Sequence, residues 1–122
     1  MSEWANRYLG LTFEDAERPC WELVREVFAR ERGVRLPAFG DAVEQGESEA
    51  WRAWRSIPSG SERGFDLVMF KVGGIEAHVG LVTRPGQMIQ VDTGISCRRE
   101  RYSEGSRMAP MVSRFLRHEA LA

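Results

Sequence analysis

The sequence predicts an α+β fold in which helices come first and an antiparallel sheet follows. A helical stripe of apolar residues follows Pro19, three apolar runs of strand length lie between residues 65 and 92, and a Ser-, Gly- and Pro-rich segment separates the two halves. At 122 residues the chain is long enough to bury one hydrophobic core. We therefore predict a single domain that spans residues 1–122.

Two helices are expected near the N-terminus. Residues 2–8 predict a short helix, because Trp4 and Tyr8 lie four positions apart on one face. The next helix is expected from Pro19 to about Arg32, with proline tolerated in its first turn. Its apolar residues share one stripe, namely Leu23, Val24, Val27 and Phe28.

A third helix is expected between Ala42 and Trp54. This segment is mostly polar and carries Trp51 and Trp54 on one edge. Its acidic residues indicate a solvated face rather than a binding site. Residues 56–64, rich in Ser, Gly and Pro, then mark the boundary between the helical half and the β half.

The second half of the chain has the pattern of antiparallel strands. Three apolar runs, separated by short turns that contain glycine, predict a meander over residues 65–72, 76–83 and 87–92. Residues 93–102 are a candidate fourth strand, and residues 113–121 fit either a strand or a short helix.

Composition argues against several classes of partner. The formal net charge is −1, which disfavours binding to nucleic acid or to an anionic membrane surface. No segment is apolar and long enough to span a membrane, and the N-terminus lacks the pattern of a signal peptide. We therefore expect a protein made in the cytoplasm without a signal peptide.

Cys20 lies at the start of the helix that begins near Pro19, and two interpretations of it are open. A thiol there faces the positive end of the helix dipole and unpaired N–H groups, which favour a thiolate and stabilise an oxyanion. Alternatively, Cys20 is a small buried residue four positions before Val24, and the local sequence alone favours this interpretation. Both Cys20 and Cys97 are expected to be free thiols.

A thiol nucleophile requires a general base, and the chain contains 2 histidines. His78 lies in an apolar strand, where an imidazole needs a polar partner, so it fits either a structural histidine or a catalytic base. His118 lies in a charged C-terminal segment and is expected at the surface. Since the cysteines and histidines are dispersed, we expect no metal site and no other cofactor.

An ordered series of motifs in this chain resembles one known family. A YLG segment precedes Cys20 and Trp21, a DLV strand starts at Asp66, and an HVG motif occupies residues 78–80. Together, residues 4–94 resemble the NlpC-type cell-wall cysteine peptidases, and within them the branch encoded with phage tails and phage-like particles. The resemblance implies a papain-like NlpC-type domain in which N-terminal helices pack on an antiparallel β-meander.

The resemblance also implies roles for individual residues. Cys20 matches the nucleophile and His78 the general base. Gln90, twelve positions after His78, takes the place of the third polar residue, which is commonly a histidine. Its side-chain carbonyl can accept a hydrogen bond from the imidazole N–H. Phe13 and Trp21 are the candidates for substrate binding.

The chain departs from the family pattern around the nucleophile. Pro19 replaces an aspartate and removes a backbone N–H near the expected oxyanion site. Glu22 replaces a small residue and places negative charge beside the thiol, which opposes the helix dipole. Phe65 replaces the glycine before the DLV strand. These changes concern catalysis rather than the fold.

The function implied by the resemblance is that of a peptidoglycan peptidase carried by a phage tail or phage-like particle. Such a protein is made in the bacterial cytoplasm and delivered to the periplasm, where it cleaves the stem peptide between γ-D-glutamate and the diamino acid. Its expected partners are stem peptides and the proteins of the tail hub or tail tip.

Two other interpretations remain open. One is a catalytically weakened or inactive subunit with a structural role in the tail tip or hub, for which the 4 tryptophans are compatible with an interface. Arginines near the C-terminus suggest either a contact with a neighbouring subunit or a solvated segment; they are Arg98, Arg99, Arg101, Arg107, Arg114 and Arg117. The other interpretation is a thiol-dependent amidase or acyltransferase that uses Cys20 and His78.

Overall fold

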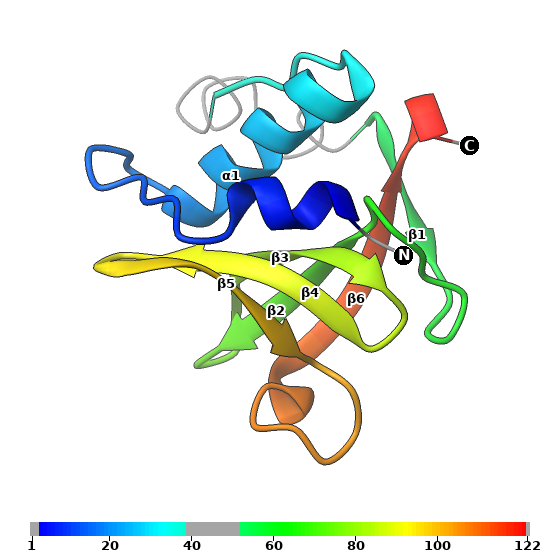
Figure 1. Cartoon of the computed structure of the whole chain (residues 1–122). Coiled ribbons are helices and arrows are strands. Elements are labelled where there is room, and N and C mark those ends of the chain that lie inside the picture. Colours follow the sequence, from blue (N-terminus) through cyan, green and yellow to red (C-terminus); the bar gives the residue numbers. More distant parts are fainter. Residues whose placement is uncertain (1–2, 39–51, 122) are drawn as a thin grey trace.

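A curved antiparallel sheet with helices packed on one face forms the body of the molecule (Figure 1). The computed structural model describes residues 3–38 and 52–121. Its helical elements are η1 (Glu3–Tyr8), α1 (Pro19–Val27), η2 (Phe28–Arg32), η3 (Ala109–Met111) and η4 (Glu119–Leu121). Its strands are β1 (Trp54–Ile57), β2 (Leu67–Val72), β3 (Ile75–Arg84), β4 (Gln87–Asp92), β5 (Ile95–Arg101) and β6 (Val112–His118).

The expected helix from Pro19 to about Arg32 is confirmed in extent, although its geometry changes along its length. Pro19 occupies the first turn of α1, and the helix continues into η2 with π-type hydrogen bonding. Gly33 ends it in the left-handed region at φ 66°, which glycine adopts without steric cost. The first predicted helix is a 3₁₀ helix, η1, which starts at Glu3; Ser2 lies outside the described residues.

The predicted helix from Ala42 to Trp54 is wrong at its C-terminal end. Residues 42–51, including Trp51 and all the acidic residues of this segment, lie outside the described residues. Trp54 starts β1, where it pairs with His118 of β6. Its ring packs against the ring of Phe28, with the centroids 5.5 Å apart, so tertiary packing overrides the local helical pattern.

The sheet confirms the predicted meander and adds a long-range pairing. Strands β2 to β5 follow one another as antiparallel neighbours, and the candidate strand after residue 93 is β5. The order of the described strands is β1-β6-β2-β3-β4-β5, because β6 returns from the C-terminal part of the chain to lie between β1 and β2. The last predicted element is therefore a strand that ends in the short helix η4.

Hydrophobic residues are buried on both faces of the sheet. One cluster lies between the helices and the sheet, and joins the apolar stripe of α1 to Leu67, Val79, Leu81 and Ile89. The opposite face carries a second cluster that consists of Val68, Phe70, Val82, Met88, Tyr102, Met108 and Phe115. Burial on two faces explains why the strands read as continuous apolar runs rather than as alternating patterns.

Gly80, the glycine of the HVG motif, lies where this second face is tightly packed. A Cβ atom at this position would lie 2.3 Å from the sulfur of Met88 and 3.2 Å from Cγ1 of Val68. A larger residue would therefore displace Met88, so the glycine allows β3 and its neighbours to pack closely.

A buried ion pair connects the residue before β2, Asp66, to Arg117 of β6. Arg117 donates from Nε to Oδ1 of Asp66 at 2.9 Å and from Nη2 to Oδ2 at 2.7 Å. Asp66 is fully buried, and the backbone N–H of Arg63 also donates to its carboxylate at 2.9 Å. Arg117 additionally donates to the carbonyl of Ser61 at 3.1 Å. The pair thus holds the loop before β2 against the end of β6.

The expectation that His118 lies at the surface is wrong. Its side chain lies at the end of β6, where its ring packs edge-on against the rings of Trp54 and Phe28. Its Nδ1 accepts a hydrogen bond from the N–H of Ala120 at 3.1 Å. Burial lowers the pKa of His118, since a charged imidazole there would lose its hydration.

The C-terminal arginines lie on or near β5 and β6 and make contacts within the chain, so they do not form a solvated tail. The guanidinium of Arg99 on β5 donates to Oδ1 of Asn6 in η1, which places this side chain on the helix-covered side of the sheet. The other contacts are Arg98 and Arg107 with Glu100, Arg101 with Ser103, Arg114 with Glu76, and Arg117 with Asp66.

Replacing Arg117 with alanine is expected to lower the free energy of unfolding by about 3–5 kcal/mol, because the buried Asp66 carboxylate loses its partner. Arg114→Ala is the matched control, since it breaks a more exposed pair with Glu76 and is expected to cost about 1 kcal/mol or less. Urea denaturation followed by tryptophan fluorescence measures both variants. Equal unfolding free energies for the two would contradict the structural role of the buried pair.

Candidate active site

The thiol of Cys20 lies at the start of α1, at the end of the helix that carries the positive dipole. Cys20 is the second residue of α1, and the helix packs on β3 and β4, which carry His78 and Gln90. The packing of one helix on two neighbouring strands therefore brings together the three residues that the sequence marked for catalysis. Each comes from a different element, and the separation along the chain exceeds fifty residues for the first two.

Gln90 holds the imidazole of His78 in one orientation. Nε2 of His78 and Oε1 of Gln90 are 2.7 Å apart, and Gln90 is 3% exposed. Because an amide oxygen only accepts hydrogen bonds, this contact assigns the proton of the neutral ring to Nε2. Nδ1 is then unprotonated, and it is the ring nitrogen left for the hydrogen bond with Cys20.

The pKa of His78 is raised by its surroundings. Burial lowers this pKa, but the hydrogen bond and the charge of Cys20 raise it, and so do the hydrogen bond of Gln90 and the charge of Asp92. The combined effect of these groups exceeds the effect of burial. An imidazole that is stabilised in its protonated form by a neighbouring sulfur is suited to accept the thiol proton.

The backbone at the start of α1 offers one candidate donor for an oxyanion. The N–H groups of Trp21 and Glu22 both donate to the carbonyl of Arg18 at 3.1 Å, and Pro19 has no N–H. Among the described residues, no backbone carbonyl outside the helix accepts the N–H of Cys20. The amide of Cys20 itself is therefore the first-turn donor that can face a tetrahedral intermediate.

The charge of Glu22 is partly compensated. Nη1 of Arg25 lies 2.9 Å from both carboxylate oxygens of Glu22, one turn further along α1. Arg25 also donates from Nε to the carbonyl of Leu36 at 3.1 Å. The sequence predicted a bare negative charge beside the thiol, whereas the structure pairs that charge with a guanidinium held in place by a backbone contact.

The second cysteine, Cys97, lies in β5 and is 2% exposed. Burial raises the pKa of its thiol to about 11, and both cysteines are free, as the sequence predicted. Within the described ranges, no three His, Cys, Asp or Glu residues gather as metal ligands would, and no helix is long and apolar enough to cross a membrane.

The two residues predicted to bind substrate lie in different environments. Phe13 is half-buried in the loop before α1 and packs against the helix-side cluster. Trp21 is 8% exposed, and its indole N–H donates to the carbonyl of Pro37 at 2.8 Å. Phe13 therefore keeps some accessible surface, whereas Trp21 is mainly a core residue. A role in substrate binding stays a prediction for both.

Glu100 is a neighbour of this site that sequence reasoning missed. It lies in β5, and its Oε1 accepts a hydrogen bond from Nε2 of Gln90 at 2.7 Å. Glu100 lies in the arginine-rich stretch CRRER, and nothing in that stretch distinguishes it from an ordinary charged residue at the surface. Only the pairing of β4 with β5 brings its carboxylate to the amide of Gln90.

Comparison with known families places this arrangement in context. The sequence profile described as the NlpC/P60 family matches residues 7–114. The chain belongs to the NlpC/P60 family. This confirms the NlpC-type assignment and the α+β fold, and family members are cysteine peptidases that act on peptidoglycan. No curated protein matches the chain.

Solved structures of this family share the fold. The NlpC/p60 domain of the peptidoglycan hydrolase SagA is 18% identical with a TM-score of 0.65, and the match covers 93% of this chain and 92% of that one. An NLP/P60 protein from Staphylococcus aureus, described as similar to lipoprotein, has the same identity and TM-score, over 93% of this chain and 38% of that one. The peptidoglycan hydrolase RipB from Mycobacterium tuberculosis is 19% identical with a TM-score of 0.62, over 94% of this chain and 60% of that one. The match thus covers almost all of one isolated NlpC/p60 domain and only part of the two longer chains.

At neutral pH, Cys20 of the folded protein is expected to react with iodoacetamide well before Cys97, since the thiolate is the reactive form and burial keeps Cys97 protonated. Intact-mass spectrometry should show one fast adduct in the wild type, none in Cys20→Ser and a fast adduct in Cys97→Ser. Equal rates for the two thiols would contradict the assignment of Cys20 as the activated group.

Proposed function

We propose that this NlpC/P60 protein is a thiol-dependent cell-wall peptidase that hydrolyses amide bonds in the stem peptides of peptidoglycan, between γ-D-glutamate and the diamino acid. The observation that carries the proposal is the contact of Cys20 with His78, whose other ring nitrogen is held by Gln90. Thiol, base and orienting group are the three parts that nucleophilic hydrolysis by cysteine requires.

The reaction proceeds in two half-reactions. Nδ1 of His78 takes the proton of the Cys20 thiol as sulfur attacks the carbonyl carbon, and the N–H of Cys20 donates to the developing oxyanion. The imidazolium then returns its proton to the leaving amine, which departs and leaves an acyl-thioester on Cys20. A water molecule, deprotonated by the same nitrogen, attacks the thioester and releases the carboxylate product and the thiol.

Gln90 supplies orientation to the base. Its neutral amide accepts the Nε2 proton and keeps Nδ1 directed to the thiol through both half-reactions. A thiol-dependent amidase would use the same three groups and water on a different amide bond, whereas an acyltransferase would use them with an amine or hydroxyl as the acceptor. Water as acceptor is favoured by the peptidoglycan hydrolases among the structural relatives, SagA and RipB.

Cys20→Ala is expected to lower the release of stem-peptide fragments from purified peptidoglycan by at least about a thousandfold, because the covalent step is lost. Liquid chromatography with mass spectrometry of the soluble products measures the rate and identifies the bond that is cut. Cys97→Ser serves as the matched control and should retain activity. Undiminished cleavage by Cys20→Ala would refute the thiol mechanism, and no cleavage by a wild type whose Cys20 is alkylated rapidly would favour a structural subunit.

We also propose that the domain travels in the tail of a phage or phage-like particle, in contact with hub or tail-tip proteins, and reaches the periplasm on delivery. The proposal rests on the ordered YLG, Cys-Trp, DLV and HVG motifs, which span residues 8–80.

Purified particles are expected to contain this protein in a fixed ratio to the tail-hub protein, because a tail component is incorporated stoichiometrically. Quantitative mass spectrometry of gradient-purified particles measures the ratio, with an abundant cytoplasmic protein as the control for carry-over. A ratio that varies between preparations in parallel with that control would contradict the assignment to a tail.

A further inference from the structure

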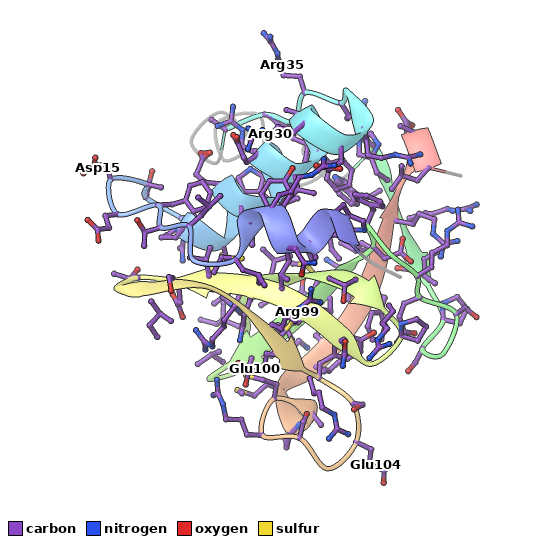
Figure 2. The ribbon with its side chains drawn as sticks, viewed as in Figure 1. Asp15, Arg30, Arg35, Arg99, Glu100 and Glu104 are labelled. Atoms are coloured by element: carbon purple, nitrogen blue, oxygen red, sulfur yellow. The ribbon has the colours of Figure 1, made fainter. Side chains whose placement is uncertain are left out.

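Three polar side chains from neighbouring strands form a hydrogen-bonded row that continues beyond the catalytic residues. His78 of β3 contacts Gln90 of β4 at 2.7 Å, and Gln90 donates to Glu100 of β5 at 2.7 Å. Figure 2 marks Glu100 on β5, close to Arg99 on the same strand. The row therefore ends on a carboxylate rather than on the neutral amide.

We propose that Glu100 is a positioning residue for this site, which selects the orientation of the Gln90 amide and transmits negative charge through it to His78. Its consequence for catalysis rests on the proposed peptidase function. Its effect on the state of the His78 ring does not depend on that function.

The first step of the argument concerns the orientation of the amide. The two ends of a glutamine amide are similar in size, and one accepts hydrogen bonds while the other donates them. An ionised carboxylate only accepts, so Glu100 selects the NH₂ end of Gln90 and leaves the oxygen for His78. With the amide reversed, its NH₂ would face Nε2 and favour the tautomer protonated at Nδ1, which cannot take the thiol proton.

The second step concerns charge. Hydrogen bonds to charged groups are stronger than those between neutral groups, and bonds in a chain polarise one another. Donation to Glu100 therefore makes the oxygen of Gln90 a better acceptor for the proton on Nε2. The negative charge that a neutral glutamine lacks is supplied from the next strand, so the imidazolium formed during catalysis is stabilised.

The third step concerns how Glu100 is itself held. Its Oε2 lies 2.9 Å from Nε of Arg107, and its Oε1 accepts from Nε of Arg98 at 3.2 Å and from Nη2 of Arg107 at 3.1 Å. The carboxylate side chain is 16% exposed. Two guanidinium groups thus bind the carboxylate and restrict the rotamer of Glu100. A surface glutamate without such partners would not hold the Gln90 amide in one orientation.

Other groups also face His78 and influence its pKa independently of Glu100. Cys20 faces it from α1, Asp92 contributes its charge from the end of β4, and the ring of Phe70 on β2 lies 5.7 Å away between centroids. Removal of the Glu100 charge leaves the Asp92 charge in place. The expected change in His78 is therefore a partial one.

Glu100→Gln is expected to lower the pKa of His78, to populate the neutral tautomer protonated at Nδ1, and to slow alkylation of Cys20 at neutral pH. Glu104→Gln is the matched control, since Glu104 carries the same charge on the turn after β5 and points away from the sheet (Figure 2). Nitrogen-15 NMR of the labelled histidine ring across a pH titration measures the tautomer and the pKa. Iodoacetamide rates give the thiol readout without any peptidoglycan.

In the peptidase assay, Glu100→Gln should lower kcat by about tenfold, the lower end of the effect of partners that orient a ligating or catalytic group, with little change in KM. The exchanged pair Gln90→Glu with Glu100→Gln puts a carboxylate directly on Nε2 and should restore the raised pKa of His78. A purely structural role for Glu100 would not predict this restoration.

Each outcome separates the two proposals. A His78 ring that responds to Glu100→Gln as it does to Glu104→Gln overturns the positioning role, even if the protein is an active peptidase. A changed ring in a protein that never cleaves peptidoglycan supports the positioning role and refutes the proposed function. If Glu100→Gln does not fold, the tautomer of His78 is measured in the wild type instead. A neutral His78 ring protonated at Nδ1 in the wild type would overturn the inference by itself.

Discussion

The packing of α1 on β3 and β4 is the interaction on which the candidate site depends. The apolar stripe of the helix is buried against the strands, with Leu23, Val24 and Val27 at 1% exposure or less. Burial of one such side chain contributes about 1.5–3 kcal/mol, so this face stabilises one position of the helix strongly. Because Cys20 precedes the stripe on the same short helix, the hydrophobic contact also determines where the thiol meets His78.

Two glutamates near the candidate site are each paired with arginines, but they contact different parts of it. Glu22 and Glu100 both lie near candidate site residues, and both are paired with arginines in the same chain. The arginine beside Glu22 reduces the negative charge at the thiol. The carboxylate of Glu100, by contrast, remains bound to the amide that holds the base. Two of the departures from the family pattern, Glu22 and Gln90, thus each have a charged hydrogen-bond partner.

The polar and aromatic contacts that hold the sheet together and the contacts of the candidate site lie on different strands. The ion pair between Asp66 and Arg117 and the aromatic contacts of His118 with Trp54 join β1, β2 and β6. The contacts between the candidate site residues His78 and Gln90 join β3 and β4, and Glu100 of β5 binds the far side of Gln90. The DLV motif therefore combines two roles, since its aspartate is buried in the ion pair while its apolar residues build the core beside the site. The DLV motif thus serves the fold, whereas the Cys-Trp and HVG motifs supply candidate site residues.

The sequence by itself determined most of the local elements and the three candidate residues of the site. Periodicity located α1 and the meander because one helical face and both sheet faces are buried, and the ordered motifs pointed to Cys20, His78 and Gln90. Pairings between distant segments were decided by the tertiary structure alone. Trp54 became a strand residue and His118 a core residue because β1 pairs with β6, and Glu100 reached Gln90 through the register of β4 and β5. Local patterns record which surfaces are buried, whereas the partner of each charged side chain depends on which strands become neighbours.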